Sequence, residues 1–375
     1  MSRVDVVTVR RGADMKAFVN LPWKIYGQDP NWVPPLKSDM ARLLNPKKHP
    51  FWKFSERELF LALRGSEVVG RIAAIVDRHY NQYHNQKMGI WGFFECENDP
   101  EAAVTLFSAA EDWIRKKDIA FMRGPLNPST NYEVGLLIRG FDTPPCLMMP
   151  YNPPYYQEMV HFCGFRKEKD LFAYRFDRDF QPPVWTTALA ERLAQKDEIT
   201  IRQFSRNNLN ADLKLMNDIY NECWAHNWGF VPMDDNELKE TARQMSIILD
   251  TELAFFLYYK GEPVGVCLIL PDVSPLLKRL NGRAGLFALI TKKLYWPEVT
   301  GLRGLLLGVK EQYHQMGLPL VVFDHLMRVL RSKEQYQYLE LGWNLEDNDA
   351  INRLYEEGGA RPTKSYRVYR KDIHK

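Results

Sequence analysis

The sequence predicts an α/β protein with a mixed central sheet that carries helices on both faces. Two observations support this fold class. Segments with strand periodicity and segments with helix periodicity alternate along the chain, and the second half repeats the plan of the first. The 375 residues are 45% hydrophobic and 26% charged, which is enough apolar material for the cores of two domains.

The first half of the chain alternates between strands and helices up to residue 176. Strands are indicated by short apolar runs or alternating polarity, and helices by apolar residues three and four positions apart. Gly65-Ser66 is typical of a hairpin turn. The expected strands are residues 4–9, 58–64, 67–77, 88–94, 119–123 and 171–176. The expected helices are residues 14–26, 100–116 and 155–163.

The same plan begins again after the composition changes at Phe176. Residues 181–197 are expected to form a linker and a connecting helix. The expected strands that follow are residues 199–204, 253–259, 263–271, 301–309 and 339–345. The expected helices are residues 210–226 and 235–249, together with two whose apolar faces are Phe323, Leu326, Met327 and Leu330, and Ala350, Ile351, Leu354 and Tyr355. Asp347-Asn348 is suited to begin the last of these helices.

Identical residues recur at one fixed offset in the two halves. Glu67 and Glu262 are 195 positions apart. The same offset relates Gly70 to Gly265, Asp77 to Asp272, Gly164 to Gly359 and Arg175 to Arg370. Repetition at one offset beside matching strands indicates a tandem duplication of a domain of about 180 residues. We therefore expect one domain over residues 1–180 and a second over residues 198–375.

The segment from residue 298 to residue 361 has the most distinctive pattern. Its loop reads His314-Gln-Met-Gly317-Leu-Pro319, and its last helix reads Asn348-x-x-Ile351-x-x-Leu354-Tyr355-x-x-x-Gly359. The segment resembles the acyl-CoA-binding core of the GNAT superfamily of N-acyltransferases. The family loop is (Arg/Gln)-x-x-Gly-x-(Gly/Ala), and the family helix is Asn-x-x-Ala-x-x-Leu-Tyr-x-x-x-Gly. Gly317 matches the loop, whereas His314 and Pro319 depart from it.

The whole chain is also similar to the YghO-like branch of this superfamily, which includes bacterial ceramide synthase. The similarity covers nearly the full length and implies a tandem GNAT fold. The matching pieces are Tyr26-Gly-Gln-Asp-Pro-Asn-Trp-Val-Pro-Pro35, Asn45-Pro-Lys-Lys-His-Pro-Phe51, Asn227-Trp-Gly-Phe-Val-Pro232 and Glu346-Asp-Asn348.

The resemblance implies that acyl-CoA or acetyl-CoA is the co-substrate. In the family, backbone N–H groups of the loop hold the CoA pyrophosphate at a helix N-terminus, because orphan amides and the positive helix end attract an anion. The corresponding residues here are His314, Gly317 and Leu318. Asn348 is either a further ligand contact or simply the cap of the last helix.

The resemblance also implies which groups carry the chemistry. The thioester carbonyl would meet a backbone N–H of the central strand, at Leu307, Gly308 or Val309. Tyr355 maps to the tyrosine that protonates the leaving thiolate; the alternative is an aromatic residue of the core. The residues themselves suggest Glu340 as a general base, since burial would raise its pKa, or else as a solvated carboxylate at a sheet edge.

We expect acyl-CoA to bind the second half only. The equivalent turn of the first half contains four carboxylates at a helix start, Glu95, Glu97, Asp99 and Glu101, which would repel a pyrophosphate. With Asp99 as N-cap and Pro100 in the first turn, this is a good structural helix start. The first half is therefore interpreted as a degenerate partner that shapes the acceptor side.

An aromatic loop is predicted to bind the acceptor or the acyl chain. It occupies the position where GNAT enzymes cover the acceptor. Its large apolar residues are Trp224, Trp228, Phe230 and Met233; the alternative is that they belong to the core. An apolar insert over residues 276–294 adds to them. Together they favour a long acyl chain on the co-substrate or a lipid-like amine as the acceptor. The acceptor is expected to be a small molecule.

Several function classes are not expected. A net charge of +3 is too small to suggest nucleic acid as a partner. Five cysteines without a CxxC pair fit a reducing cytoplasm and argue against a zinc site, and His79 and His84 are poorly spaced on a predicted loop. Neither a signal peptide nor a transmembrane segment is expected, although peripheral membrane contact is compatible with the sequence. The oligomeric state is left open.

The sequence thus predicts a cytoplasmic N-acyltransferase that moves an acyl group from acyl-CoA to an amine. One alternative is a Fem-type peptidyl transferase that uses aminoacyl-tRNA, although such enzymes usually carry a basic coiled-coil arm that this sequence lacks. The other is a non-catalytic acyl-CoA or lipid-binding protein, which the departures at His314 and Pro319 favour.

Overall fold

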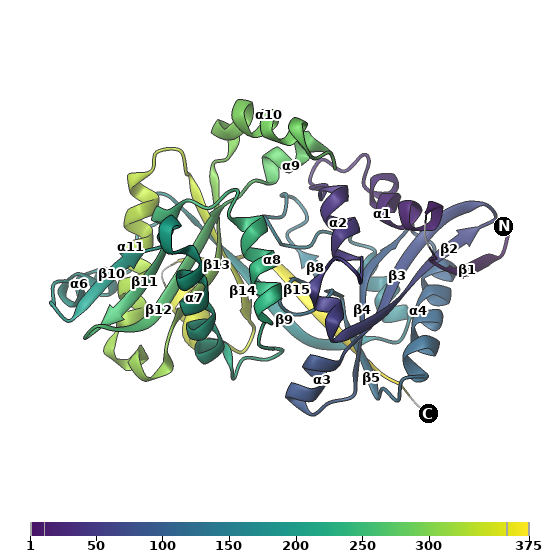
Figure 1. Ribbon diagram of the computed structural model, residues 1–375, viewed down its shortest axis with the longest axis horizontal. Helices are drawn as coiled ribbons and strands as arrows, with labels where there is room; N and C mark the ends of the chain where they lie inside the picture. Colours follow the sequence, from purple (N-terminus) through teal and green to yellow (C-terminus); the bar gives the residue numbers. More distant parts are fainter. Residues whose placement is uncertain (1, 11, 358, 374–375) are drawn as a thin grey trace. The chain divides into compact units, whose positions relative to one another are not determined.

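The computed structural model describes residues 2–10, 12–357 and 359–373 (Figure 1). These residues form two compact units. The first contains the chain up to Leu171, residues 277–293 and the chain from Lys364 onward. The second contains residues 172–276 and 294–363. The units are therefore not two consecutive halves of the chain.

The first unit is built on a mixed sheet in the order β1-β2-β3-β4-β5-β15. Its strands are β1 (Val4–Thr8), β2 (Ser55–Arg64), β3 (Glu67–Asp77), β4 (Met88–Cys96), β5 (Phe121–Gly124) and β15 (Pro362–Asp372). Neighbours are antiparallel except β4 and β5, which are parallel. A short strand β8 (Leu136–Arg139) pairs with β15, and β6 (Leu126–Asn127) pairs with β7 (Glu133–Val134).

Helices pack on both faces of this sheet. In the first half of the chain, the helices of this unit are α1 (Ala13–Ile25), α2 (Lys37–Leu43), α3 (Arg78–His84), α4 (Pro100–Arg115) and α5 (Tyr156–Phe162), with a 3-10 turn at Pro50–Lys53. Residues 277–293 add most of two later helices. Arg71 and Ile72 are adjacent on β3 and so point to opposite faces. Arg71 lies over Phe18 of α1, whereas Ile72 belongs to the core that α4 covers.

Helix α4 illustrates why the sequence folds in this way. Its residues Ala103, Leu106, Phe107, Ala110 and Ile114 recur at helical spacing and are buried in the main core of the unit. Asp99 accepts a hydrogen bond from the Ala102 N–H at 3.2 Å, and Pro100 stands in the first turn. The helix start expected from the sequence is thus confirmed.

The second unit has the same pattern of pairing. Its strands follow the order β9-β14-β13-β12-β11-β10, antiparallel from β10 to β13 and parallel between β13 and β14. The bounds are β9 (Arg166–Asp177), β10 (Ile199–Gln203), β11 (Ala254–Tyr259), β12 (Glu262–Pro271), β13 (Gly301–Val309) and β14 (Tyr338–Leu345). Three antiparallel pairings followed by one parallel pairing in each unit confirm the internal repeat and the predicted fold class.

The remaining helices belong to the second half of the chain. They are α6 (Val184–Ala194), α7 (Leu209–Trp224), α8 (Asp235–Met245), α9 (Ser274–Leu280), α10 (Leu286–Tyr295), α11 (Leu318–Ser332) and α12 (Asp349–Glu357). The 3-10 turns are Arg206–Asn208, Thr251–Leu253, Trp296–Glu298 and Glu311–Met316. Helix α7 packs on β12 and β13, and α11 packs on β13.

Each unit receives the last strand of the other half of the repeat. Strand β15 ends the second half, yet it pairs with β5 in the first unit, where Tyr369 is the register partner of Gly124. Strand β9 ends the first half, and from Phe172 onward it belongs to the second unit, beside β14. Two of the boundaries between the units therefore fall inside these two strands, and the other two fall inside α9 and α10.

One local expectation is wrong. His79 and His84 were predicted to lie on a loop, but both belong to α3. The reason is Asp77, which ends β3 and accepts a hydrogen bond from the Tyr80 N–H at 3.1 Å, so that it caps the helix.

Candidate active site

Strands β13 and β14 separate halfway along their length. Their pairing runs from Gly301 with Tyr338 to Gly304 with Leu341. Residues 306–309 of β13 are paired with β12, where Leu305 lies at a register shift, and residues 305–309 have no register partner on β14. The burial changes at the same point, because residues 301–304 are buried and residues 305–308 are only half-buried. Residues 342–344 of β14 are half-buried as well.

This separation leaves one edge of β13 available for hydrogen bonding. In an antiparallel pair, backbone groups point alternately toward the partner strand and away from it. Some N–H and C=O groups of residues 305–309 therefore point to the edge that β14 has left. Leu307, Gly308 and Val309, the residues expected to meet the thioester carbonyl, all lie in this stretch.

The aromatic loop lies directly over this strand. Gly308 faces Trp224 at the end of α7, so closely that a Cβ at position 308 would collide with the indole ring. The Trp224 ring packs on Tyr220 at 5.2 Å between centroids, and Tyr220 packs on Phe230 at 5.3 Å. The structure thus brings two of the predicted substrate residues, Trp224 and Phe230, to the site.

The four aromatic-loop residues differ in burial. Phe230 is 5% exposed and belongs to the core of the second unit. Trp224, Trp228 and Met233 are half-buried. Phe230 therefore fits the core interpretation, whereas the other three residues retain exposed surface.

Tyr355 lies on the buried side of α12. Its ring contacts those of Tyr174, Phe176 and Phe323, with centroids 5.2, 4.9 and 6.0 Å away. Burial raises its pKa well above the ordinary value for tyrosine, and the thiol of Cys267 acts in the same direction. The Tyr355 side chain is only 4% exposed. It is protonated at neutral pH and can donate a proton.

The loop before α11 uses much of its own hydrogen-bonding capacity. The Tyr313 N–H donates to Lys310 O and the Gly317 N–H to His314 O, both at 3.0 Å. The His314 ring Nε2 lies 2.6 Å from Val309 O. Pro319 has no N–H, and the Leu320 N–H contacts Gly317 O at 3.1 Å. The predicted phosphate-binding loop is therefore tightly folded on itself.

Gly317 is required by the geometry of this loop. Its φ of 79° lies in the left-handed region, where glycine is strongly favoured. A Cβ at this position would lie 3.1 Å from Leu193 on α6. The glycine that matches the family motif thus joins the 3-10 turn at Glu311–Met316 to helix α11, whose first residue is Leu318.

Glu340 and Arg303 form a buried pair of residues with opposite charges. They are register partners on the parallel strands β14 and β13, so their side chains leave the sheet on the same face. Glu340 and Arg303 are each only 4% exposed. The structure thus excludes a solvated edge carboxylate at position 340. Arg303 was not anticipated, because its charge gave no sign of burial until the strand register was known.

Asn348 stands immediately before α12, in the position of a helix cap. Its carbonyl accepts a hydrogen bond from the Asn352 N–H at 3.0 Å. The Asn352 side chain in turn donates to Leu345 O at 2.9 Å. Asn348 therefore shapes the turn between β14 and α12.

The equivalent region of the first unit is closed by the chain itself. Phe93 interrupts β4 with a positive φ of 49°, and its N–H donates to the Asn127 side chain at 2.6 Å. A Cβ at Gly92 would collide with the carbonyl of Leu126. Residues 126–127 thus occupy the edge of β4 that corresponds to the open edge of β13. We call residues 126–127 the plug of the β4 edge. The sequence analysis did not anticipate it, because the Asn127-Pro128 pair in a long loop was the only signal.

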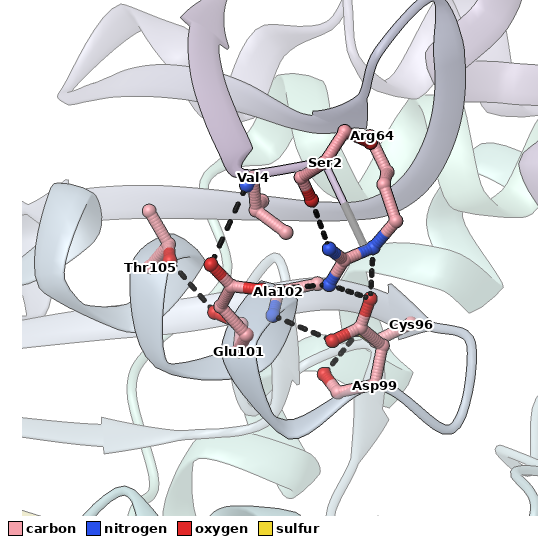
Figure 2. Close-up of polar contacts among 8 residues, drawn as sticks. All are labelled: Ser2, Val4, Arg64, Cys96, Asp99, Glu101, Ala102 and Thr105. Atoms are coloured by element: carbon pink, nitrogen blue, oxygen red, sulfur yellow. Dashed lines mark hydrogen bonds and ion pairs between the residues drawn. The ribbon is translucent and has the colours of Figure 1, made fainter.

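The acidic helix start of the first unit is also neutralised internally. Arg64 pairs with Asp99 at 2.7 Å and with Glu101 at 2.8 Å, as Figure 2 shows. Glu97 pairs with Lys24, and Glu95 lies 3.5 Å from buried Arg71. All four carboxylates therefore have cationic partners, and Asp99 already caps the helix that an anion would approach.

Glu95 is the centre of a buried polar network. It accepts hydrogen bonds from the hydroxyls of Tyr26 at 2.6 Å and Tyr156 at 2.9 Å. Burial raises the pKa of Glu95, although Arg71 and the two hydroxyls oppose the shift. These contacts stabilise the interior of the first unit.

Comparisons with known proteins agree with this geometry. No family model matches the chain. It is 34% identical to "Bacterial ceramide synthase" of Caulobacter vibrioides, covering 99% of this chain and 98% of that protein. It is 32% identical to "Protein YghO" of Escherichia coli, covering 96% of this chain and 93% of that protein.

Solved structures show the same fold at low sequence identity. A tandem GNAT protein from the clavulanic acid biosynthesis pathway matches with a TM-score of 0.57 and 11% identity, over 100% of this chain and 99% of that one. A GCN5-related N-acetyltransferase from Sphaerobacter thermophilus matches with a TM-score of 0.53 and 14% identity, over 100% and 97%. Within the described part of the chain, no helix is long and apolar enough to cross a bilayer, and no three His, Cys, Asp or Glu residues cluster as metal ligands would.

Proposed function

Because the chain belongs to the family of bacterial ceramide synthase and YghO, we propose that it is an N-acyltransferase that uses acyl-CoA or acetyl-CoA. One observation carries the proposal. Strand β13 has an edge that β14 leaves, with half-buried apolar residues and the Trp224 ring at the same place. Such an edge fits the amide-containing arm of CoA, which would add to the sheet as a short extra strand.

The reaction would be the aminolysis of a thioester. The nitrogen of a neutral amine attacks the carbonyl carbon, and a backbone N–H of Leu307, Gly308 or Val309 stabilises the negative charge on the carbonyl oxygen. The C–S bond then breaks, and Tyr355 donates its proton to the thiolate. The products are an amide and CoA. Glu340 is proposed to accept the proton that the amine loses. Loss of this proton to water and uptake of one by the Tyr355 phenolate would return both groups to their starting states.

The CoA is proposed to bind the second unit only. The plugged β4 edge and the neutralised acidic turn support this choice, because they remove both the strand edge and the anion site from the first unit. In the second unit, His314, Gly317, Leu318 and Asn348 are proposed to approach the phosphates. Since several amides of that loop are already used, we expect the pantetheine arm to contribute more affinity than the phosphates do.

The acceptor is proposed to be a lipid-like amine. The half-buried side chains of Trp224, Trp228 and Met233 offer an apolar surface next to β13. The name of one relative, bacterial ceramide synthase, fits such an acceptor.

All five cysteines are free thiols, which supports a reducing compartment such as the cytoplasm.

A mass-spectrometric assay tests the proposed activity. Purified protein is mixed with acetyl-, octanoyl- or palmitoyl-CoA and a long-chain amino alcohol, and free CoA and the amide product are measured. We expect both to form together. Release of CoA without the amide would indicate hydrolysis and contradict the transfer to an amine.

The same assay separates the second candidate function. The tightly folded loop and Pro319 favour a non-catalytic acyl-CoA-binding protein, because fewer amides remain for the phosphates. Native mass spectra that show bound acyl-CoA, with no CoA released over several hours, would support this alternative.

A further inference from the structure

Helix α10 carries its apolar side chains on its solvent side. Leu286 is 72% exposed, Leu289 63%, Ile290 47% and Leu294 63%. The side that faces the protein consists of smaller or polar residues, since Ala288, Lys292 and Tyr295 are half-buried and Thr291 is only 3% exposed. The apolar face of α10 therefore points to solvent, whereas the apolar face of a core helix points to the interior. These residues belong to the apolar insert that was expected to add to the aromatic loop, but most of them face outward.

The surrounding chain carries one sign of charge. No Asp or Glu occurs between Asp272 and Glu298, whereas five basic residues do. They are Lys278, Arg279, Arg283, Lys292 and Lys293. Arg283 and Lys293 are exposed, and the Arg283 guanidinium lies over the ring of Phe287 at 4.1 Å. The segment also ends in two aromatic residues suited to an interface, Tyr295 and Trp296.

The turn that leads into α10 is held by contacts with the N-terminal part of the first unit. Lys278 on α9 donates to Pro30 O, and the Trp23 indole N–H donates to the Asn281 side chain, both at 2.6 Å. The Lys37 N–H donates to Gly282 O at 3.1 Å. The turn between α9 and α10 is thus held by side-chain and backbone contacts, so that the apolar side of α10 is presented on a defined support.

We propose that α10 is a membrane-binding helix that lies in the surface of an anionic bilayer. Leucine and isoleucine side chains would enter the acyl region, while the basic residues would pair with anionic headgroups. Charge complementarity selects this occupant, because a second copy of the same helix would bring the same positive charges together. Attachment of this kind does not depend on the proposed acyltransferase activity, so its test needs no acyl-CoA.

Vesicle co-sedimentation of the full chain tests the proposal. The vesicles are made of phosphatidylcholine alone or of equal parts phosphatidylcholine and phosphatidylglycerol. We expect binding to the anionic vesicles that weakens as salt is added. The triple variant Leu286→Ser/Leu289→Ser/Ile290→Ser should lower this binding by about two orders of magnitude, because three exposed apolar side chains no longer enter the bilayer.

Two matched controls identify the cause of a loss. Phe162→Ser removes an equally exposed apolar side chain, also 72% exposed, from the end of α5 and should bind like the wild type. The double variant Arg283→Gln/Lys293→Gln should weaken binding to anionic vesicles by about an order of magnitude. Lys47→Gln/Lys116→Gln, which removes two exposed charges elsewhere, should have little effect.

Two results would overturn the proposal. The first is equal vesicle binding, or no binding, by the wild type and the triple variant while both unfold at the same temperature. The second is a wild-type dimer in light scattering that the triple variant abolishes, without vesicle binding by either. In that case the apolar side of α10 is an interface between two copies of the chain.

Discussion

At the scale of single residues, the two units share a backbone plan but differ at one sheet edge. In the first, the side chain of Asn127 satisfies the N–H of Phe93 at the interruption of β4. In the second, the corresponding edge of β13 stays half-exposed under Trp224. A buried N–H without an acceptor costs about 1–3 kcal/mol, so the first edge needs its plug, whereas the second can use a ligand.

The role of Tyr355 in the chemistry is tested by removing only its hydroxyl. Tyr355→Phe keeps the ring packed against Tyr174 and Phe176. We expect kcat for the release of CoA to fall about 100-fold with little change in KM, since the proton is donated only in the transition state. The control is Tyr174→Phe, which removes a neighbouring hydroxyl that donates to Glu356 at 2.9 Å. An unchanged kcat for Tyr355→Phe would leave this tyrosine with a packing role.

The pH dependence of stability is tested at Asp170. Burial opposes ionisation, but hydrogen bonds from Arg367 and Lys167 lower the pKa of this carboxyl overall. Arg367 donates to both carboxylate oxygens, at 2.7 and 2.9 Å. A lowered folded pKa stabilises the protein above the unfolded pKa of about 3.9, and this contribution is lost as the pH falls through the folded pKa.

Asp170→Asn should therefore lower the free energy of unfolding by about 1–3 kcal/mol at pH 7, between the values for exposed and buried pairs. The deficit relative to wild type should shrink below about pH 4. Urea denaturation at several pH values measures it. A deficit that stays constant down to pH 2 would show that the charge of Asp170 is not responsible.

At the scale of elements, the loop from β13 to α11 is the proposed phosphate-binding segment. Gly317 lies in the left-handed region next to Leu193, and the amide groups around it are largely used. Gly317 could be identified from the sequence, because it matches the family motif. The internal hydrogen bonds of the loop could not, since they depend on the turn that residues 311–316 adopt.

The Gly317→Asp variant tests this loop by calorimetry. We expect CoA affinity to fall by an amount equivalent to about 1–3 kcal/mol, because a carboxylate repels the phosphates and a side chain strains the backbone. Glu97→Lys, at the equivalent turn of the first unit, should bind CoA like the wild type. Normal binding by Gly317→Asp, with weakened binding by Glu97→Lys, would move the CoA site to the first unit.

At the scale of the whole molecule, the sequence predicted the fold class and most strands, because periodicity and the repeat are local or regular signals. It did not reveal that β9 and β15 are exchanged between the units. A strand shows the same alternation whichever neighbour it pairs with. The Arg303–Glu340 juxtaposition and the Asn127 plug were likewise invisible, since both arise from contacts between distant segments.

Acyl-chain length is a property of the whole site. Each buried CH₂ contributes about 0.8 kcal/mol before ordering costs, so affinity should rise steeply from acetyl- to palmitoyl-CoA. Trp228→Ser should flatten this rise, because the side chain is only half-buried and its loss spares the core. Phe230→Asp is unsuitable, since Phe230 is 5% exposed and a carboxylate there would destabilise the fold. Equal affinities for acetyl- and palmitoyl-CoA in calorimetry would contradict a long-chain site.

The exchanged strand β15 has a consequence for how the protein is made. A ribosome releases the chain from its N-terminus, and domains generally fold as they emerge. Here the first unit lacks its sixth strand until residues 369–372 have left the exit tunnel, because Tyr369 to Asp372 are the partners of β5. The N-terminal unit should therefore stay incomplete until the strand over residues 362–372 has been translated. A nascent chain arrested before residue 362 should be far more sensitive to protease in its first 171 residues than the released protein is.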